Sequence, residues 1–179
     1  MCDTTDNLLA RGYQVRREHR LSDAKSLFGE AIDRSRIAND EVLLARSLIG
    51  LGQIERDLHD LDAALKHYED AVRIYRTLDD PLGLAHTIRH LGDILRNRGE
   101  LGPAAPCYEE ALRIYRKREN TPPLDMANAI RGYALLKGEA GDTQAAVLLW
   151  REAGALYAQV GVEAGVAESD AQIARMTGA

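Results

Sequence analysis

The sequence has few aromatic residues, little cysteine and no long apolar run. Only 5% of its 179 residues are aromatic although 45% are hydrophobic, so Leu, Ala, Ile and Val supply most apolar side chains. This composition favours helices packed through small and unbranched side chains and disfavours a β-rich fold. The two cysteines, Cys2 and Cys107, are too few for a disulfide framework or a cysteine-based metal site.

The absence of long apolar runs also excludes a membrane-spanning helix. No stretch approaches the roughly 18 consecutive apolar residues that such a helix needs. The first residues, MCDTTDNLLARG, lack the basic-then-apolar order of a signal peptide. We therefore expect a cytoplasmic protein with no membrane partner, and the net charge of −5 argues against a general nucleic-acid binder.

What the sequence does contain is an internal repeat. The segment EDAVRIYR at 69–76 returns as EEALRIYR at 109–116. Four columns of residues share this register, with spacings of 40, 40 and 42 residues. They are Gly12, Gly52, Gly92 and Ala134; Ala24, Ala64, Ala104 and Ala146; Phe28, Tyr68, Tyr108 and Trp150; and Ala31, Ala71, Ala111 and Ala153. Small residues in the first column allow close helix packing, and the aromatic column fills the space beside it.

Each repeat is predicted to be a helical hairpin, because its apolar residues recur at intervals of three and four. The predicted units cover about 5–40, 41–81, 82–123 and 124–162. A capping helix follows at 163–177, with a polar face formed by Glu163, Glu168, Asp170 and Arg175. A lone hairpin cannot bury its apolar face, so we expect the repeats to stack into one domain over residues 1–179. His19, His59, Gly99 and Gly141 share a column at the turn inside each hairpin.

These columns resemble the tetratricopeptide repeat family, which has a small residue in the first helix and Ala, aromatic, Ala in the second. The units of 40 to 42 residues exceed the usual length of about 34 and look like the longer variety of kinesin light chains and many bacterial arrays. The family's proline is replaced by Arg36, Arg76, Arg116 and Ala158. The resemblance implies an all-α fold, a right-handed α-solenoid of four hairpins plus the capping helix. It also implies a non-catalytic scaffold or adaptor that binds proteins.

In this family the first helices line a concave groove. Its positions lie six and three residues before the small column, and one, four and five residues after it. Seven arginines and four acidic residues fall on these positions here, although the whole chain is acidic. The predicted binding residues are Arg16, Arg46, Gln53, Arg56, His86, Arg89, Asp93, Arg96, Asn128 and Arg131, with Arg56, Arg89, Arg96 and Arg131 as central anchors. Since arginine binds carboxylates through two bonds, an acidic protein or peptide is the expected partner. Arginines on a merely solvated face remain an alternative.

The carboxylate clamp that this family uses in chaperone adaptors does not match. Its positions hold Leu9, Tyr13, Gln53, Arg89 and Asp93, of which only Arg89 offers a comparable charge. A second hypothesis is a structural module that self-assembles as a homodimer or holds a larger complex together, through the convex face or an array end. The expected oligomeric state is a monomer or a weak homodimer.

A third hypothesis, a metal-dependent regulator or enzyme, rests on His86 and His90. These histidines are one helical turn apart and Asp93 follows. No Glu follows the first histidine as a helical zinc-protease motif requires, and Arg89 and Arg96 would repel a dication. The sequence contains no recognisable catalytic set, so we expect no enzyme activity, no metal and no cofactor.

Overall fold

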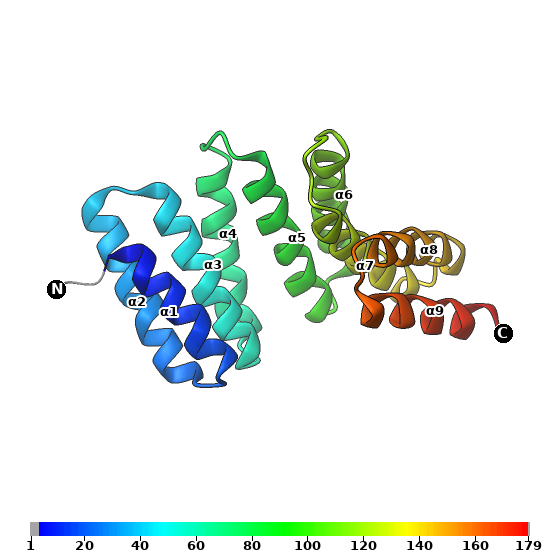
Figure 1. Cartoon of the computed structure of the whole chain (residues 1–179), viewed down its shortest axis with the longest axis horizontal. Coiled ribbons are helices and arrows are strands. Elements are labelled where there is room, and N and C mark those ends of the chain that lie inside the picture. Colours follow the sequence, from blue (N-terminus) through cyan, green and yellow to red (C-terminus); the bar gives the residue numbers. More distant parts are fainter. Residues whose placement is uncertain (1–3, 179) are drawn as a thin grey trace. The chain divides into compact units, whose positions relative to one another are not determined.

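The computed structural model describes residues 4–178, which form nine α-helices and no β-strand (Figure 1). In chain order these are α1 (Thr5–Arg17), α2 (Leu21–Ala38), α3 (Glu41–Asp57), α4 (Leu61–Tyr75), α5 (Pro81–Asn97), α6 (Leu101–Arg116), α7 (Pro123–Glu139), α8 (Thr143–Gln159) and α9 (Glu163–Thr177). The all-α prediction of four helical hairpins and a final helix is confirmed. Among the described residues, every helix is too short or too polar to span a lipid bilayer.

The helices divide into two compact units, and the division falls between Thr87 and Ile88 inside α5. In unit 1, α1 packs against α2 and α3, and α3 packs against α2 and α4. In unit 2, α7 packs against α6 and α8, and α9 packs against α8. The second part of α5 joins α6 through a hydrogen bond from Tyr108 to Asp93. That all hairpins form one domain stays a prediction.

Each hairpin turns through one residue with a left-handed backbone. The φ angles are 60° at His19, 63° at His59, 80° at Gly99 and 82° at Gly141. These are the four residues of the turn column, so the alignment of two histidines with two glycines reflects a shared backbone conformation. Glycine adopts this conformation without strain, whereas histidine is only tolerated there. In two of the hairpins, an aspartate then caps the second helix: Asp60 accepts from the backbone N–H of Ala63, and Asp142 from that of Ala145.

The aromatic column fills the centre of each hairpin, and all four of its members, Phe28, Tyr68, Tyr108 and Trp150, are fully buried. In unit 1 the Phe28 ring lies so close to Gly12 that a Cβ there would be 2.8 Å from the ring, and a Cβ at Gly50 would overlap it. Gly12 belongs to α1 and Gly50 to α3, so one ring is wedged between two successive first helices. Tyr108 has the same relation to Gly92 and Gly132 in unit 2.

Helix α9 occupies the place of a further first helix but differs at one position. Four residues before the small column, the first helices carry Leu8, Leu48, Ile88 and Ile130, all buried. The corresponding residue of α9 is Asp170, which is exposed. Glu163 and Arg175 are also exposed, as predicted for a capping helix, whereas the side chain of Glu168 turns inward to Arg131.

Candidate functional site

The predicted binding residues of unit 1 lie on α1 and α3 and form what we call the unit-1 face. It consists of Asp6, Tyr13, Arg16, Arg17, Arg46, Gln53, Arg56 and Asp57. The groove positions three residues before the small column, Leu9 and Ile49, are not part of it, because both are buried in the core. The face is therefore a polar surface carried by two neighbouring helices.

Two ion pairs join α1 to α3 on the unit-1 face. The Arg16 guanidinium donates from Nε to Asp57 Oδ2 at 2.6 Å and from Nη2 to Asp57 Oδ1 at 3.2 Å. Its Nη1 donates to Gln53 Oε1 at 3.1 Å. Arg46 donates to Asp6 at 3.1 Å near the other end of the two helices. Arg16 is thus held in a fixed orientation by a bidentate carboxylate, and it has little capacity left to bind a second one in the same way.

Arg56 differs from these paired arginines. Its nearest carboxylate is Asp57, and the closest approach is 4.0 Å, while Asp57 is already bound by Arg16. The side chain is 27% exposed, so its guanidinium is partly shielded but reachable. Arg17 is exposed one residue beyond Arg16. Four arginines share two carboxylates on the unit-1 face, which leaves it with an excess of positive charge.

Tyr13 lies at the middle of the unit-1 face. Its ring meets Phe28 edge to face, with centroids 5.0 Å apart and planes inclined by 69°. Burial raises the pKa of the Tyr13 hydroxyl, and the positive charges of Arg46 and Arg16 partly oppose this shift. The phenol is therefore neutral at physiological pH and is close enough to both ion pairs to feel their charge.

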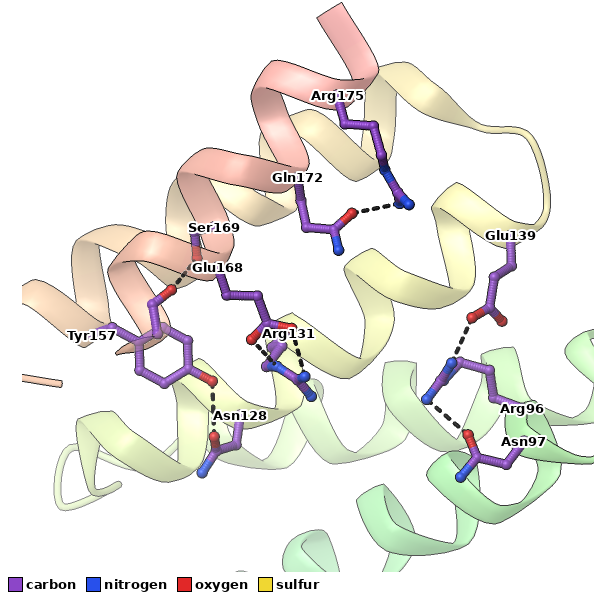
Figure 2. A network of polar contacts seen from close by, with 11 residues as sticks. Arg96, Asn97, Asn128, Arg131, Glu139, Tyr157, Glu168, Ser169, Gln172 and Arg175 are labelled. Carbon is purple, nitrogen blue, oxygen red and sulfur yellow. Dashed lines mark hydrogen bonds and ion pairs between the residues drawn. The ribbon is translucent and has the colours of Figure 1, made fainter. Parts of the chain in front are cut away.

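In unit 2 the predicted residues form a second surface, the unit-2 face, which contains Arg89, Asp93, Arg96, Asn128, Arg131, Glu139 and Glu168. Figure 2 shows how two of its arginines, Arg96 and Arg131, are paired. Arg96 of α5 donates to Glu139 of α7 at 2.5 Å. Arg131 of α7 binds Glu168 of α9 through two hydrogen bonds of 2.6 Å each. These pairs link successive first helices, as Arg16 and Asp57 do in unit 1.

Two members of the unit-2 face, Arg89 and Asp93, belong to a buried polar cluster. Arg89 is 8% exposed, donates to Asp93 at 3.2 Å and contacts His90 at 2.7 Å. Tyr108 donates its hydroxyl to the other oxygen of Asp93 at 2.7 Å. Burial opposes ionisation of Asp93, but the hydrogen bond from His90 and the Arg89 charge, helped by Tyr108, outweigh it and lower its pKa to about 2. Asp93 is thus the carboxylate that allows Arg89 to be buried.

Unit 2 therefore has no excess of positive charge on its face, since three arginines face three carboxylates. Asn128 is half-buried and accepts a hydrogen bond from the Tyr157 hydroxyl at 2.8 Å, which leaves its amide N–H groups available (Figure 2). His86 is also half-buried and lies on the part of α5 that belongs to unit 1. The structure thus pairs most of the predicted arginines and leaves the positive excess on unit 1.

The structure gives no support to the metal hypothesis that rests on His86 and His90. His90 lies against Arg89 and Asp93, and its Nδ1 is 3.4 Å from the Asp93 carboxylate. Among residues 4–178, no group of three His, Cys, Asp or Glu side chains is placed to hold a metal ion.

Sequence reasoning missed the ion pairs between hairpins, although a signal for them is present. Arginines four residues after the small column, Arg16 and Arg96, pair with acids five residues after the next small column, Asp57 and Glu139. The spacings of 41 and 43 residues are one repeat plus one residue. Glu168 was predicted only as part of the polar face of the capping helix, so its pairing with Arg131 was missed.

Comparisons with known proteins identify the family. Two family models for the tetratricopeptide repeat match residues 3–77 and 84–120, which together are more than half of the sequence. The chain belongs to the tetratricopeptide repeat family. Repeats of this family generally serve as protein-interaction modules, and this general role extends to the chain. No curated protein sequence matches it.

Solved structures show the same tetratricopeptide-like fold. BtubC (BKLC) from P. vanneervenii is similar with a TM-score of 0.79 and 21% identity, over 88% of this chain and 64% of that one. The apo form of RapI is similar with a TM-score of 0.84 and 12% identity, over 92% of this chain and 60% of that one. The chain spans less than two thirds of the length of either protein. At these identities the likeness shows the helical-repeat solenoid fold alone, which confirms the predicted fold class.

Proposed function

We propose that this chain is a non-catalytic adaptor that binds an acidic protein segment on the unit-1 face. The observation that carries the proposal is the charge of that face, which has four arginines and two carboxylates, and within residues 4–178 no carboxylate lies closer than 4.0 Å to Arg56. A partly shielded guanidinium binds a carboxylate more strongly than a fully solvated one, because less water competes for it. The cytoplasmic location of this chain stays a prediction from the sequence.

The residues of the unit-1 face have different roles in this proposal. Arg56 is the residue that binds a ligand carboxylate, and Arg17 adds exposed charge beside the Arg16–Asp57 pair. Gln53 and Asp57 hold Arg16 in place, so Arg16 acts mainly as a positioning residue and presents its remaining N–H groups. Arg46 is the second flanking arginine and is 46% exposed.

The predicted residues of unit 2 enter the proposal with a weaker electrostatic role. Arg96 and Arg131 are occupied by Glu139 and Glu168, and Arg89 is buried. We therefore assign them to the stability of the repeats. Asn128, Asp93 and His86 remain predicted contacts, of which Asn128 has the clearest means of binding, through its amide N–H groups.

Capture from a cell lysate, read by mass spectrometry, tests the proposal. The variant Arg17→Glu/Arg56→Glu should lose acidic proteins that the wild type retains. Lys66→Glu/Arg73→Glu is the matched control, because it makes the same charge change on exposed residues of α4 in the same unit. A captured partner should bind the first variant at least about tenfold more weakly than the control, and its affinity for the wild type should fall with salt. Equal capture by both variants would refute the role of the unit-1 face.

The carboxylate of Asp57 offers a second test. If Asp57 competes with the ligand for positive charge, Asp57→Asn should strengthen the binding of the captured partner about two- to fivefold. Weaker binding after this change would contradict the assignment of Asp57 as a competitor and would make Arg16, in its present orientation, a direct contact.

A further inference from the structure

A pocket of about 410 Å³ lies between α6 and α7 in unit 2, outside the unit-1 and unit-2 faces. It is lined by Glu109, Leu112, Arg113, Arg116 and Lys117 on one side and by Tyr133 of α7 on the other. The first four are three, four and seven residues apart and so share one face of α6. The pocket thus lies along one face of α6, the second helix of its hairpin.

The walls of this pocket are apolar and fixed. Leu112 is 3% exposed and forms a buried base. The Tyr133 ring stacks on Tyr108, with centroids 6.0 Å apart and an interplanar angle of 29°. The Tyr133 hydroxyl donates to Glu109 at 2.6 Å, so the one carboxylate among the lining residues is already engaged. These contacts hold the Tyr133 ring in place as a side wall.

The rim of the pocket is cationic. Arg113 is 60% exposed, and its nearest carboxylate, on Glu110, is 3.9 Å away. Lys117 is exposed and makes no ion pair within residues 4–178. Arg116 contacts Glu152 of α8 at 3.0 and 3.1 Å, which fixes its guanidinium at the edge of the pocket. Two exposed cations, Arg113 and Lys117, and one oriented cation, Arg116, therefore surround an apolar recess.

The repeat pattern separates what the fold requires from what this pocket adds. The α6 segment 109–116 matches 69–76 of α4, so Arg113 and Arg116 have counterparts in another hairpin. Lys117 and Tyr133 do not. In the same columns the other hairpins carry Ile37, Thr77 and Gln159 instead of lysine, and Arg11, Leu51 and Leu91 instead of tyrosine. Leucine is sufficient for packing at positions 51 and 91. The phenol of Tyr133 and the ammonium of Lys117 are therefore specific to this pocket.

We propose that the pocket between α6 and α7 binds an acidic protein segment, one apolar side chain of which enters between Leu112 and Tyr133. A volume of about 410 Å³ accommodates one large side chain, and the stems of Arg113 and Arg116 extend its apolar surface. The charged ends of Arg113 and Lys117 then meet carboxylates on either side of that residue. A cationic rim beside an apolar recess is complementary to a protein segment that carries an apolar side chain between carboxylates.

The test uses short fluorescein-labelled peptides of Asp and Glu with either Phe or Ala at the centre, and fluorescence anisotropy as the readout. A short single-stranded RNA of equal charge serves as the competing class of ligand. All titrations are made in the Arg17→Glu/Arg56→Glu background, so that binding at the unit-1 face does not contribute. The Phe peptide should bind at least about fivefold more tightly than the Ala peptide.

Three variants locate that binding. Adding Arg113→Glu/Lys117→Glu should weaken the Phe peptide at least about tenfold, while the charge-matched Lys66→Glu/Arg73→Glu changes its affinity less than about threefold. Tyr133→Leu installs the residue that other hairpins carry and should remove most of the difference between Phe and Ala peptides. Amide chemical shifts in two-dimensional NMR spectra should change at Leu112 and Tyr133 when the Phe peptide is added.

Several results would overturn the proposal. Equal affinity for the Phe and Ala peptides would exclude insertion of an apolar side chain. Equal loss in the pocket variant and the control would show that binding depends on total charge alone. Tighter binding of the RNA would make the pocket a phosphate site. Each of these outcomes leaves the proposal for the unit-1 face unaffected, because that face is inactivated in the background used.

Discussion

Replacing Asp93 with asparagine should destabilise unit 2 and change how its stability depends on pH. Asp93 receives hydrogen bonds from Arg89 and Tyr108, and Arg89 is 8% exposed. Asparagine keeps the shape and one carbonyl oxygen, so Tyr108 retains a partner. The buried guanidinium of Arg89, however, loses the negative charge that compensates it.

Two routes bracket the magnitude. The pKa of Asp93 falls from its ordinary value of 3.8 to about 2 in the folded protein, which corresponds to about 2 kcal/mol of stability at neutral pH. Removing one partner of a buried ion pair costs about 3–5 kcal/mol. Because the Asp93 side chain is 19% exposed, we expect a loss of about 3 kcal/mol, or a Tm about 6–12 °C lower.

The pH dependence has a definite sign. A carboxylate with a lowered folded pKa stabilises the protein fully above its unfolded pKa, and this contribution disappears as the pH falls through the folded pKa. The difference in free energy of unfolding between the wild type and Asp93→Asn should therefore be constant above about pH 5. It should fall as the pH is lowered from about 4 to about 2.

The single tryptophan makes this measurement specific to unit 2. Trp150 is fully buried in that unit, so its fluorescence during urea denaturation reports the unfolding of unit 2 even if unit 1 unfolds separately. Asp70→Asn is the control, because Asp70 is 44% exposed and pairs only with Arg73 on its own helix. A difference below about 1 kcal/mol near pH 7, or one that stays unchanged as the pH falls to about 3, would refute the reasoning.

Two further predictions concern packing and the ion pairs. Gly50→Ala should lower the free energy of unfolding by about 1–3 kcal/mol, because its Cβ would overlap Phe28. Gly29→Ala, in open space on α2, should raise it by about 0.5–1 kcal/mol, and thermal unfolding compares the two variants. A double-mutant cycle with Arg131→Met and Glu168→Gln should give a coupling free energy of about 1 kcal/mol that declines in high salt. A coupling of zero, or an alanine at Gly50 that stabilises, would contradict the geometry described here.

The helical framework could be predicted from the sequence because its determinants repeat. Gly12 and Phe28 recur in register, and each copy must solve the same packing problem, so the columns alone indicate the hairpins. The left-handed turn residues were aligned for the same reason. Gly50 and Gly132 lie two residues before the small column, but the other hairpins carry Ala10 and His90 there, so the sequence holds only a partial signal that Phe28 and Tyr108 each contact two first helices.

The state of the predicted arginines could not be obtained in this way. Whether Arg131 is free or paired depends on Glu168, 37 residues later, and a pattern of charges does not say which acid lies within reach in space. Burial of Arg89 is set by the residues around it, including Asp93 and Tyr108, rather than by its own period. The sequence therefore predicts which helices line a surface, but not where on that surface positive charge remains.

The wedging of Phe28 between Gly12 and Gly50 bears on how such an array can change its length. The ring needs a small residue on its own hairpin and another on the next, so the interlocking extends over one full repeat period of 40 residues. Duplication of the period 41–80 preserves both small neighbours of the Phe28 ring, whereas its loss would bring His90 to the place of Gly50. An insertion of any other length inside a helix leaves a ring facing a larger side chain. Growth of the array by gene duplication is therefore favoured in whole periods.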